Sequence, residues 1–368
     1  MNMLNKTDGL EIHKSSIVID GHSDMLSDLA GRRDRGENNV LSRLWAPKFR
    51  KAGISAIICQ TGSDTQHSAA HPMCHQIFNC SPYYPLKRTL QILDAVLLDI
   101  DESEDDILIV KKAADIEKAK KEDKLGIILS IEGTLALEGD LSILRQLHRL
   151  GIRSVQHVHH IRNRAGDPAT ELSPGGLTKF GVDLVNELNR LHMVIDTAHL
   201  SEGGFWDVLK NSKDPVIFSH GCVKSLCDHP RNLSDKQIKA LAENGGVIGI
   251  HAIASFLSEE PRKAKLDDMF DHIDHAVEIA GIDHVGFGLH PGLTFLGVDK
   301  KLPNEAYKEF YGPCYDKLIG AIFTEGIQDV TDVPKITQGL YERGYSEKEL
   351  RKFLGGNFLR VFNHVFGG

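Results

Sequence analysis

Histidine, aspartate and glutamate follow short apolar runs at four places in the chain. One run ends in His22-Ser23-Asp24, and side chains alternate along an extended segment, so His22 and Asp24 are expected on the same side. Glu132, His199 and His220 follow three further runs. A carboxylate in such a place needs a cation or hydrogen bonds to offset its desolvation. Imidazole nitrogens and carboxylate oxygens bind divalent metals, so these residues are candidate ligands of a binuclear centre, with one Glu132 oxygen for each ion.

An arginine and further histidines lie close in sequence to these candidates. Arg231 stands in a loop beside Pro230, where a guanidinium could bind a substrate carboxylate through two parallel hydrogen bonds. A surface salt bridge is the alternative for this arginine. Of the three histidines that follow another apolar run, alternation lets only His157 and His159 share a face. Eight other histidines are expected to be surface or packing residues: His67, His71, His75, His192, His251, His272, His275 and His284.

Eight strand-like runs alternate with stretches of helical spacing. The runs are Ile17–Asp20, Ile54–Gln60, Gly126–Ile131, Ser154–Val158, Met193–Asp196, Val216–Ser219, Gly246–His251 and His284–Gly288. Mostly apolar strands separated by helices are typical of a parallel sheet that is buried on both faces. Eight such units predict an α/β fold, a closed (β/α)8 TIM barrel. Barrel enzymes build their sites at the carboxyl ends of the strands, which is where the candidate ligands stand.

Residues 1–368 are expected to form a single domain with a helical C-terminal extension from about residue 303. An open dinucleotide-binding sheet is disfavoured, because no glycine-rich phosphate loop follows any of the runs. Ser234–Gln237 has the capping-box pattern and predicts a helix that runs to about Glu243. Two insertions stand out: His67–Pro85 is expected to form a loop over the barrel mouth, and the charged segment Asp99–Lys124 a solvated helix.

The composition is that of a soluble globular protein. The 43 Lys and Arg against 51 Asp and Glu leave a formal charge of −8, which argues against a nucleic-acid binder. No apolar stretch approaches the roughly 18 residues that a membrane span needs, and the N-terminus does not resemble a secretory signal, so a cytoplasmic location is expected. The six cysteines form no CxxC pair, and buried or unreactive thiols are expected.

Six motifs occur in order along the chain: Asp20–Asp24, Ile131–Gly133, Gly176–Gly181, Asp196–Ser201, Asp228–Asp235 and Gly355–Phe362. Together they resemble the membrane dipeptidase (renal dipeptidase) family of the amidohydrolase superfamily, from about Ile17 to Phe366. The resemblance implies a (β/α)8 TIM barrel of the metal-dependent hydrolase type, a site for two zinc ions and cleavage of dipeptides, some with a C-terminal D-residue. It also implies a homodimer.

The resemblance implies a role for each matched residue. His22 and Asp24 would bind one zinc ion, His199 and His220 would bind the other, and Glu132 would bridge them. Arg231 would bind the C-terminal carboxylate of the dipeptide. His159 would help to polarise the scissile carbonyl, although residues 158–167 depart from the commonest family pattern.

One position departs from the family more clearly. The last barrel strand of the family normally ends in an aspartate that transfers the proton to the departing amine, whereas the aligned residue here is His290. An imidazole, with an unperturbed pKa near 6.5, can shuttle a proton. Beside two zinc ions its protonated form is disfavoured, and a neutral imidazole could bind metal instead. His290 is therefore a candidate catalytic residue together with Glu132, with these two roles open.

These observations favour one function and leave an alternative. The leading hypothesis is zinc-dependent hydrolysis of dipeptides by a metal-activated water. The alternative, which His290 motivates, is a catalytically impaired or repurposed dipeptidase-fold protein that binds a ligand or acts on a different small amide. A small dipeptide or amide is the expected partner in either case, and neither nucleic acid nor a membrane is expected.

Overall fold

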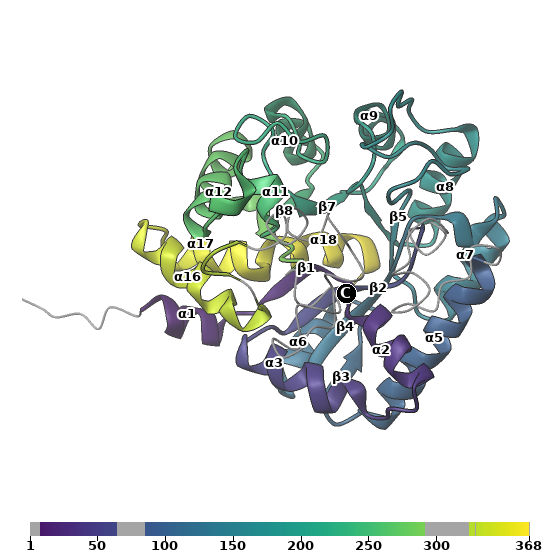
Figure 1. The fold of residues 1–368 in the computed structure, drawn as a ribbon, viewed down its shortest axis with the longest axis horizontal. Helices are drawn as coiled ribbons and strands as arrows, with labels where there is room; N and C mark the ends of the chain where they lie inside the picture. The colour runs from purple at the N-terminus through teal and green to yellow at the C-terminus, as the bar shows by residue number, and fades with distance from the viewer. Residues whose placement is uncertain (1–7, 65–84, 291–323, 328, 368) are drawn as a thin grey trace, which may run out of the picture.

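The computed structural model describes residues 8–64, 85–290, 324–327 and 329–367. Its centre is a parallel sheet with the strand order β1-β2-β4-β5-β6-β7-β8-β9 (Figure 1). These strands are β1 Ile19–Ser23, β2 Ala56–Ser63, β4 Leu125–Glu132, β5 Ser154–Gln156, β6 Val194–Asp196, β7 Ile217–Gly221, β8 Val247–Ile250 and β9 Val285–Phe287. Each strand overlaps one of the eight apolar runs, so the predicted positions of the strands are confirmed.

The sheet curves into a nearly closed barrel. Each strand pairs in parallel with the next one in the order. The backbone N–H of Leu289, just after β9, donates a hydrogen bond of 2.8 Å to Oδ1 of Asp20 in β1. Because β1 and β9 stand at opposite ends of the strand order, this bond joins the two edges. The predicted (β/α)8 barrel is confirmed.

Helices surround the barrel and cover the outer face of the strands (Figure 1). They are α1 Gly9–Ser15, α2 Met25–Asp34, α3 Ala46–Lys51, α5 Pro85–Glu102, α6 Ala114–Lys121, α7 Leu141–Arg149, α8 Lys179–Arg190, α9 Glu202–Asn211, α10 Asp235–Glu243, α11 Ala254–Leu257, α12 Leu266–Ala280, α16 Val333–Glu342, α17 Glu347–Arg351 and α18 Asn357–Phe366. Short 3-10 or π-helical turns occupy Leu41–Trp45, Leu135–Leu137, Pro261–Lys263, Ile282–His284, Val330–Asp332 and Lys352–Gly356.

Local sequence signals account for where two of these helices begin. Ser234 and Gln237 form the predicted capping box, in which each side chain bonds the backbone N–H of the other, and α10 ends at Glu243 as expected. Thr178 caps α8 through the backbone N–H of Gly181. Both helices then bury their apolar stripe, so capping fixes the start of each helix and burial fixes its orientation.

The last helix closes the amino end of the barrel. Phe358 of α18 packs in one apolar cluster with Ile19, Ala56, Val194 and Ile217, which are the first residues of four strands. Among the described residues the C-terminal extension thus consists of α16, α17 and α18, and residues 303–323 lie outside them. Because α18 covers the amino ends, the carboxyl ends of the strands are left for a site.

The expected single helix over Asp99–Lys124 is wrong. The segment contains the end of α5, a short strand β3 at Ile107–Ile109 and then α6. Asp99 is fully buried, because its carboxylate accepts hydrogen bonds from the backbone N–H groups of Val40 and Leu41. The apolar residues Ile107–Ile109 pair in parallel with β4 outside the main strand order. The strand β3 was not predicted, because its short apolar run lies among charged residues.

Three further expectations concern loops, thiols and membrane spans. The predicted loop His67–Pro85 falls outside the described residues except for Pro85, which begins α5. Cys59, Cys222 and Cys227 are buried free thiols, as expected, and the other three cysteines lie outside the described part. None of the helices in the described part is long and apolar enough to cross a membrane.

Candidate metal centre and substrate site

The five predicted ligands meet at the carboxyl end of the barrel. All five are buried, with at most 9% of each residue exposed. Oε1 of Glu132 lies 3.1 Å from Nε2 of His199, 3.8 Å from Nε2 of His22 and 3.9 Å from Nε2 of His220. Oδ1 of Asp24 lies 3.6 Å from Nε2 of His22. Side chains from four separate segments therefore converge around one carboxylate.

The spacing of these atoms fits zinc. Two ligands that share a tetrahedral zinc at bond lengths of about 2.1 Å lie about 3.4 Å apart. The Nε2 atoms of His199 and His220 are 3.0 Å apart. The separations of 3.1 Å between His199 and Glu132 and of 3.6 Å between His22 and Asp24 lie on either side of about 3.4 Å. Nε2 of His22 and Oε1 of Glu132 are buried and make no hydrogen bond in the described part of the chain. Imidazole and carboxylate ligands with unpaired buried atoms are what a zinc site requires.

Two neighbouring side chains orient the histidines, and neither was predicted from the sequence. Ser219 Oγ lies 2.8 Å from Nδ1 of His220, and the Gln60 amide lies 3.3 Å from Nδ1 of His22. The Ser219 hydroxyl can accept a hydrogen bond from Nδ1–H of His220. The Gln60 amide can accept one from Nδ1–H of His22 if the amide group is flipped, so that its oxygen and not its nitrogen faces the ring. Each bond would then leave Nε2 with a lone pair for a metal. A polar residue inside an apolar strand run is the sequence signal for both.

Two buried aspartates connect the segments that carry the ligands. Oδ1 of Asp20 accepts from the backbone N–H of His22 at 3.3 Å, in addition to its bond from Leu289. Oδ1 of Asp196 accepts from the backbone N–H of Ser219 at 3.0 Å and so ties β6 to β7. Burial raises the pKa of Asp20 to about 7 and also raises the pKa of Asp196. Both aspartates belong to the sequence motifs, but no role was predicted for either of them.

The electrostatics of the cluster favour a cation at its centre. Burial raises the pKa of Glu132 above its ordinary value. Burial also opposes a charge on His22, but the carboxylates of Glu132 and Asp24 outweigh it and raise the pKa of this histidine. Burial lowers the pKa of His199 and of His220 well below the ordinary value, so both imidazoles are neutral and can act as ligands. A metal ion would replace the proton that the carboxylates attract to His22.

His290 lies beside the first pair of ligands, just after β9. Its Nε2 is 3.2 Å from Oδ2 of Asp24, and its ring stacks on that of His22 with centroids 4.8 Å apart and planes inclined by 15°. Its backbone has a left-handed φ of 44°. Burial lowers the pKa of His290 to about 4, so its imidazole is neutral near pH 7.

Arg231 is a buried cation with unused hydrogen-bond donors. The residue is 3% exposed, and in the described part of the chain its Nε and Nη1 atoms have no hydrogen-bond partner. The surface salt bridge considered as an alternative is therefore wrong. Burial lowers the pKa of Arg231 to about 10, which leaves it charged at neutral pH. His229 fixes the loop, because its Nδ1 accepts from the backbone N–H of Arg231 at 3.1 Å.

Of the histidines after β5, His159 reaches the cluster. Its Nε2 lies 3.6 Å from Oε2 of Glu132, and its ring meets that of His199 edge-on at 4.3 Å. The exposed His160, which strand alternation placed on the opposite side, also comes near, with its ring 3.9 Å from that of His159. The chain leaves the extended conformation after Gln156, so alternation no longer applies at His160.

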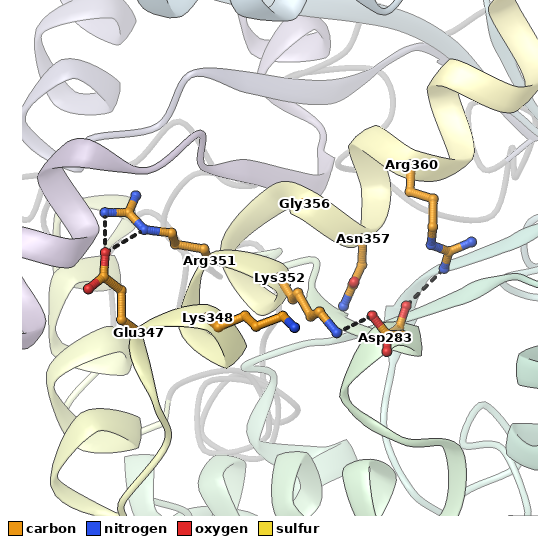
Figure 2. Close-up of a pocket in the computed structure, with 8 residues that line it drawn as sticks. All are labelled: Asp283, Glu347, Lys348, Arg351, Lys352, Gly356, Asn357 and Arg360. Carbon is orange, nitrogen blue, oxygen red and sulfur yellow. Dashed lines mark hydrogen bonds and ion pairs between the residues drawn. The ribbon is translucent and has the colours of Figure 1, made fainter.

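A pocket elsewhere on the molecule carries cations but does not resemble a ligand site (Figure 2). Its Asp283 precedes β9, so the pocket lies at the amino end of the barrel, opposite the histidine cluster. Arg351 is paired with Glu347 at 2.8 Å, and Lys352 with Asp283 at 2.5 Å. Arg360 donates to the backbone oxygen of Asp283 at 2.8 Å. These three cations already have partners within the chain.

Comparisons with known proteins agree with this geometry. The family model described as membrane dipeptidase (peptidase family M19) matches residues 8–302 and 315–366. A relative from Claviceps purpurea (strain 20.1), dipeptidase tcpJ, is 30% identical over 282 residues, which are 76% of this chain and 60% of that protein. The chain thus spans less than two thirds of that relative.

Two solved structures have the same fold over almost the whole chain. An amidohydrolase from Pseudomonas aeruginosa has a TM-score of 0.77 and 26% identity over 98% of this chain and 100% of its own. A metallo peptidase from Rhodobacter sphaeroides, liganded with a phosphinate mimic of the dipeptide L-Ala-D-Ala, has a TM-score of 0.74 and 24% identity over 95% of this chain and 100% of its own. With a buried histidine and carboxylate cluster in a parallel barrel, these matches show that this chain belongs to the membrane dipeptidase family, peptidase family M19, and is a hydrolase of the metallodipeptidase type.

Proposed function

We propose that this protein hydrolyses dipeptides at a centre of two zinc ions. His22 and Asp24 would hold one ion, His199 and His220 the other, and Glu132 would contribute an oxygen to each. The observation that carries this proposal is the position of Oε1 of Glu132, which lies within 3.9 Å of the Nε2 atoms of all three histidines.

The chemistry divides between the metal and the chain. Zinc, when bound, acidifies water and polarises a carbonyl group. Arg231 binds the C-terminal carboxylate of the substrate through its unpartnered N–H groups and so fixes the scissile bond in place. His159, 3.6 Å from Glu132, orients the carbonyl oxygen by hydrogen bonding. Burial around both residues excludes water, which strengthens these interactions.

The guanidinium also supports a preference for short peptides. Arg231 is buried in the same cluster and interacts electrostatically with Glu132, so the carboxylate that it binds must belong to the residue just after the scissile bond. A longer peptide would place an uncharged amide against a buried cation, which is unfavourable. Dipeptides, including those with a C-terminal D-residue, are therefore the proposed substrates.

A panel of L,L- and L,D-dipeptides with zinc-loaded protein tests this proposal. We expect hydrolysis of at least one stereochemical class and a loss of about 10³-fold or more in kcat for Glu132→Gln, because one bridging ligand is removed. Glu171→Gln, a loop carboxylate outside the cluster, is the matched control and should retain full activity. Equal turnover by Glu132→Gln and the wild type would show that the cluster is not the catalytic centre.

A second candidate function is ligand binding without efficient hydrolysis. The observation that favours it is His290, which occupies the position where the resemblance implies a proton-transferring aspartate. The same panel separates the two functions when His290→Asp is included. A gain of about 10²-fold or more in turnover for this variant would support an impaired enzyme. Rapid wild-type turnover would exclude it.

A further inference from the structure

We propose that His290 is a metal ligand, which completes the first metal position together with His22 and Asp24. The inference rests on the zinc centre proposed above. It assigns His290 to metal binding and not to proton transfer.

The separations of the three ligand groups carry the inference. Nε2 of His290 lies 3.2 Å from Oδ2 of Asp24, and Nε2 of His22 lies 3.6 Å from Oδ1 of the same carboxylate. One ligand atom from each of these residues lies within 4.8 Å of the other two. Ligands of one tetrahedral zinc lie about 3.4 Å apart, so one ion can contact all three residues.

The rings of His22 and His290 are neighbours on either side of the Asp24 carboxylate. Their ring centroids lie 4.8 Å apart, and both rings present Nε2 to the Asp24 carboxylate. Each oxygen of Asp24 thus faces one imidazole. Two other groups of possible ligands occur among the described residues, one with His22, Glu132 and His220 and one with His159, His160 and His199, and neither includes His290. His290 therefore stands on the Asp24 side of the first metal position, whereas the scissile bond is expected near Glu132.

The backbone holds His290 in this place from two directions. A Cβ at Gly288 would collide with the carbonyl oxygen of Ser219, so this glycine lets β9 lie close against β7. The next residue, Leu289, is bonded to Asp20 through its backbone N–H at 2.8 Å. His290 then takes a left-handed φ of 44°, an uncommon conformation for a residue other than glycine. Contacts on both sides of β9 thus fix where the imidazole stands.

An imidazole ligand would change the character of the first site. Each metal position would then have two histidines, with Asp24 as an added oxygen ligand at the first. Nitrogen ligands favour zinc and cobalt over manganese, which prefers oxygen. The substitution of His for Asp also removes one negative charge near the first ion, so a monovalent anion would be bound there more readily than in an aspartate-containing site.

Zinc affinity tests the inference without reference to activity. It is measured on protein that has been stripped of metal with a chelator and has not been unfolded and refolded. We choose His290→Asn, because asparagine tolerates a left-handed backbone and offers no imidazole. Titration against a chromophoric chelator should show two tight zinc ions in the wild type. In His290→Asn one of them should bind about 100-fold more weakly, since even partners outside the ligand shell contribute about 10- to 100-fold.

A control and a spectroscopic signature make the result specific. His251→Gln removes another buried imidazole, whose ring lies 6.3 Å from that of His220, and should leave both zinc affinities unchanged. X-ray absorption at the zinc edge should show fewer imidazoles per zinc in His290→Asn than in the wild type. His290→Asp should recover part of the lost affinity through its oxygen. Circular dichroism of each variant checks that it is folded.

The outcomes separate this inference from the proposed function. Unchanged zinc affinities and imidazole count in folded His290→Asn would overturn the inference, even if the wild type cleaves dipeptides. A loss of affinity in that variant would support it, even if no dipeptide is cleaved. A wild type that binds no zinc would overturn both.

Discussion

Arg231 is a single buried guanidinium in the proposed substrate site. Arg231 is 3% exposed, and Nε and Nη1 have no hydrogen-bond partner in the described residues. Removing a cation from water without a partner is unfavourable by several kcal/mol. The fold accepts this penalty at Arg231, and a bound carboxylate would reduce it by accepting two charge-assisted hydrogen bonds.

Arg231→Met should therefore weaken substrate recognition and spare the fold. Charge-assisted hydrogen bonds contribute about 1.5–3 kcal/mol each, so the loss of two should lower kcat/KM for a dipeptide about 10²- to 10⁴-fold, mainly through KM. The corresponding dipeptide amide, which lacks the carboxylate, is the matched control and should lose little. The melting temperature should not fall, because the variant removes a buried guanidinium whose Nε and Nη1 have no hydrogen-bond partner in the described residues. An equal loss for both substrates would contradict carboxylate binding by Arg231.

Among the helices, α1 is held by one buried histidine. Nδ1 of His13 lies 2.6 Å from Oγ1 of Thr337 on α16, and Nε2 lies 2.8 Å from the backbone oxygen of Ala52 at the end of α3. Burial lowers the pKa of His13. The neutral ring satisfies both partners, with Nε2–H as donor and Nδ1 as acceptor. One imidazole thus connects three helices at the edge of the barrel.

This arrangement makes the contribution of α1 to stability dependent on pH. His13 is neutral in the folded chain, whereas the unfolded chain binds a proton below about pH 6.5, so the stability from His13 is present above that pH and is lost as pH falls toward the lowered folded pKa. His13→Ala should cost about 1–3 kcal/mol at pH 7.5 and less at pH 5.5, as measured by urea denaturation.

The matched control is Ser16→Ala at the end of the same helix. It removes the hydrogen bond from Ser16 Oγ to the backbone oxygen of Ile12 but no titratable group, so its cost should be the same at both pH values. A cost of His13→Ala that does not change with pH would show that the histidine is equally protonated in the folded and unfolded chains.

For the whole molecule, the proposed metal centre joins segments that are far apart in sequence. His22 in β1, Glu132 in β4 and His220 in β7 meet at the carboxyl end of the barrel, while α18 closes the amino end. A ligand that binds only the folded chain stabilises it by mass action. The homodimer and the cytoplasmic location expected from the sequence stay predictions.

Removal of zinc should consequently destabilise the whole barrel. Zinc at about 1,000 times its Kd stabilises the folded state by about 4 kcal/mol, which corresponds to several degrees in Tm. Scanning calorimetry before and after dialysis against a chelator measures the shift, and returned zinc should reverse it. His220→Asn, which lacks one ligand, should show a smaller shift. Identical melting curves with and without zinc would contradict a metal centre at these residues.

Local sequence patterns were enough to predict the barrel strands and the candidate ligands. Apolar runs of four to seven residues identified every barrel strand, because burial on both faces requires continuous apolar sequence. Five residues were recognisable as candidate ligands, because each stands within four residues after the end of a run: His22, Asp24, Glu132, His199 and His220. Their convergence followed from the barrel, in which all parallel strands end at one rim. β3 was missed because three apolar residues among charges give too weak a signal.

The sequence does not predict which side-chain atoms of the site lie beside one another, and the folded structure is needed to see this. The register between strands decides three features of the site. These are the burial of Arg231, the bonds from Gln60 and Ser219 to the histidines, and the approach of His290 to Asp24. Register is set by packing among residues distant in sequence, such as Gly288 against Ser219, and no local pattern encodes it. Local sequence thus predicts the candidate ligands, whereas the distances between them arise from closure of the barrel.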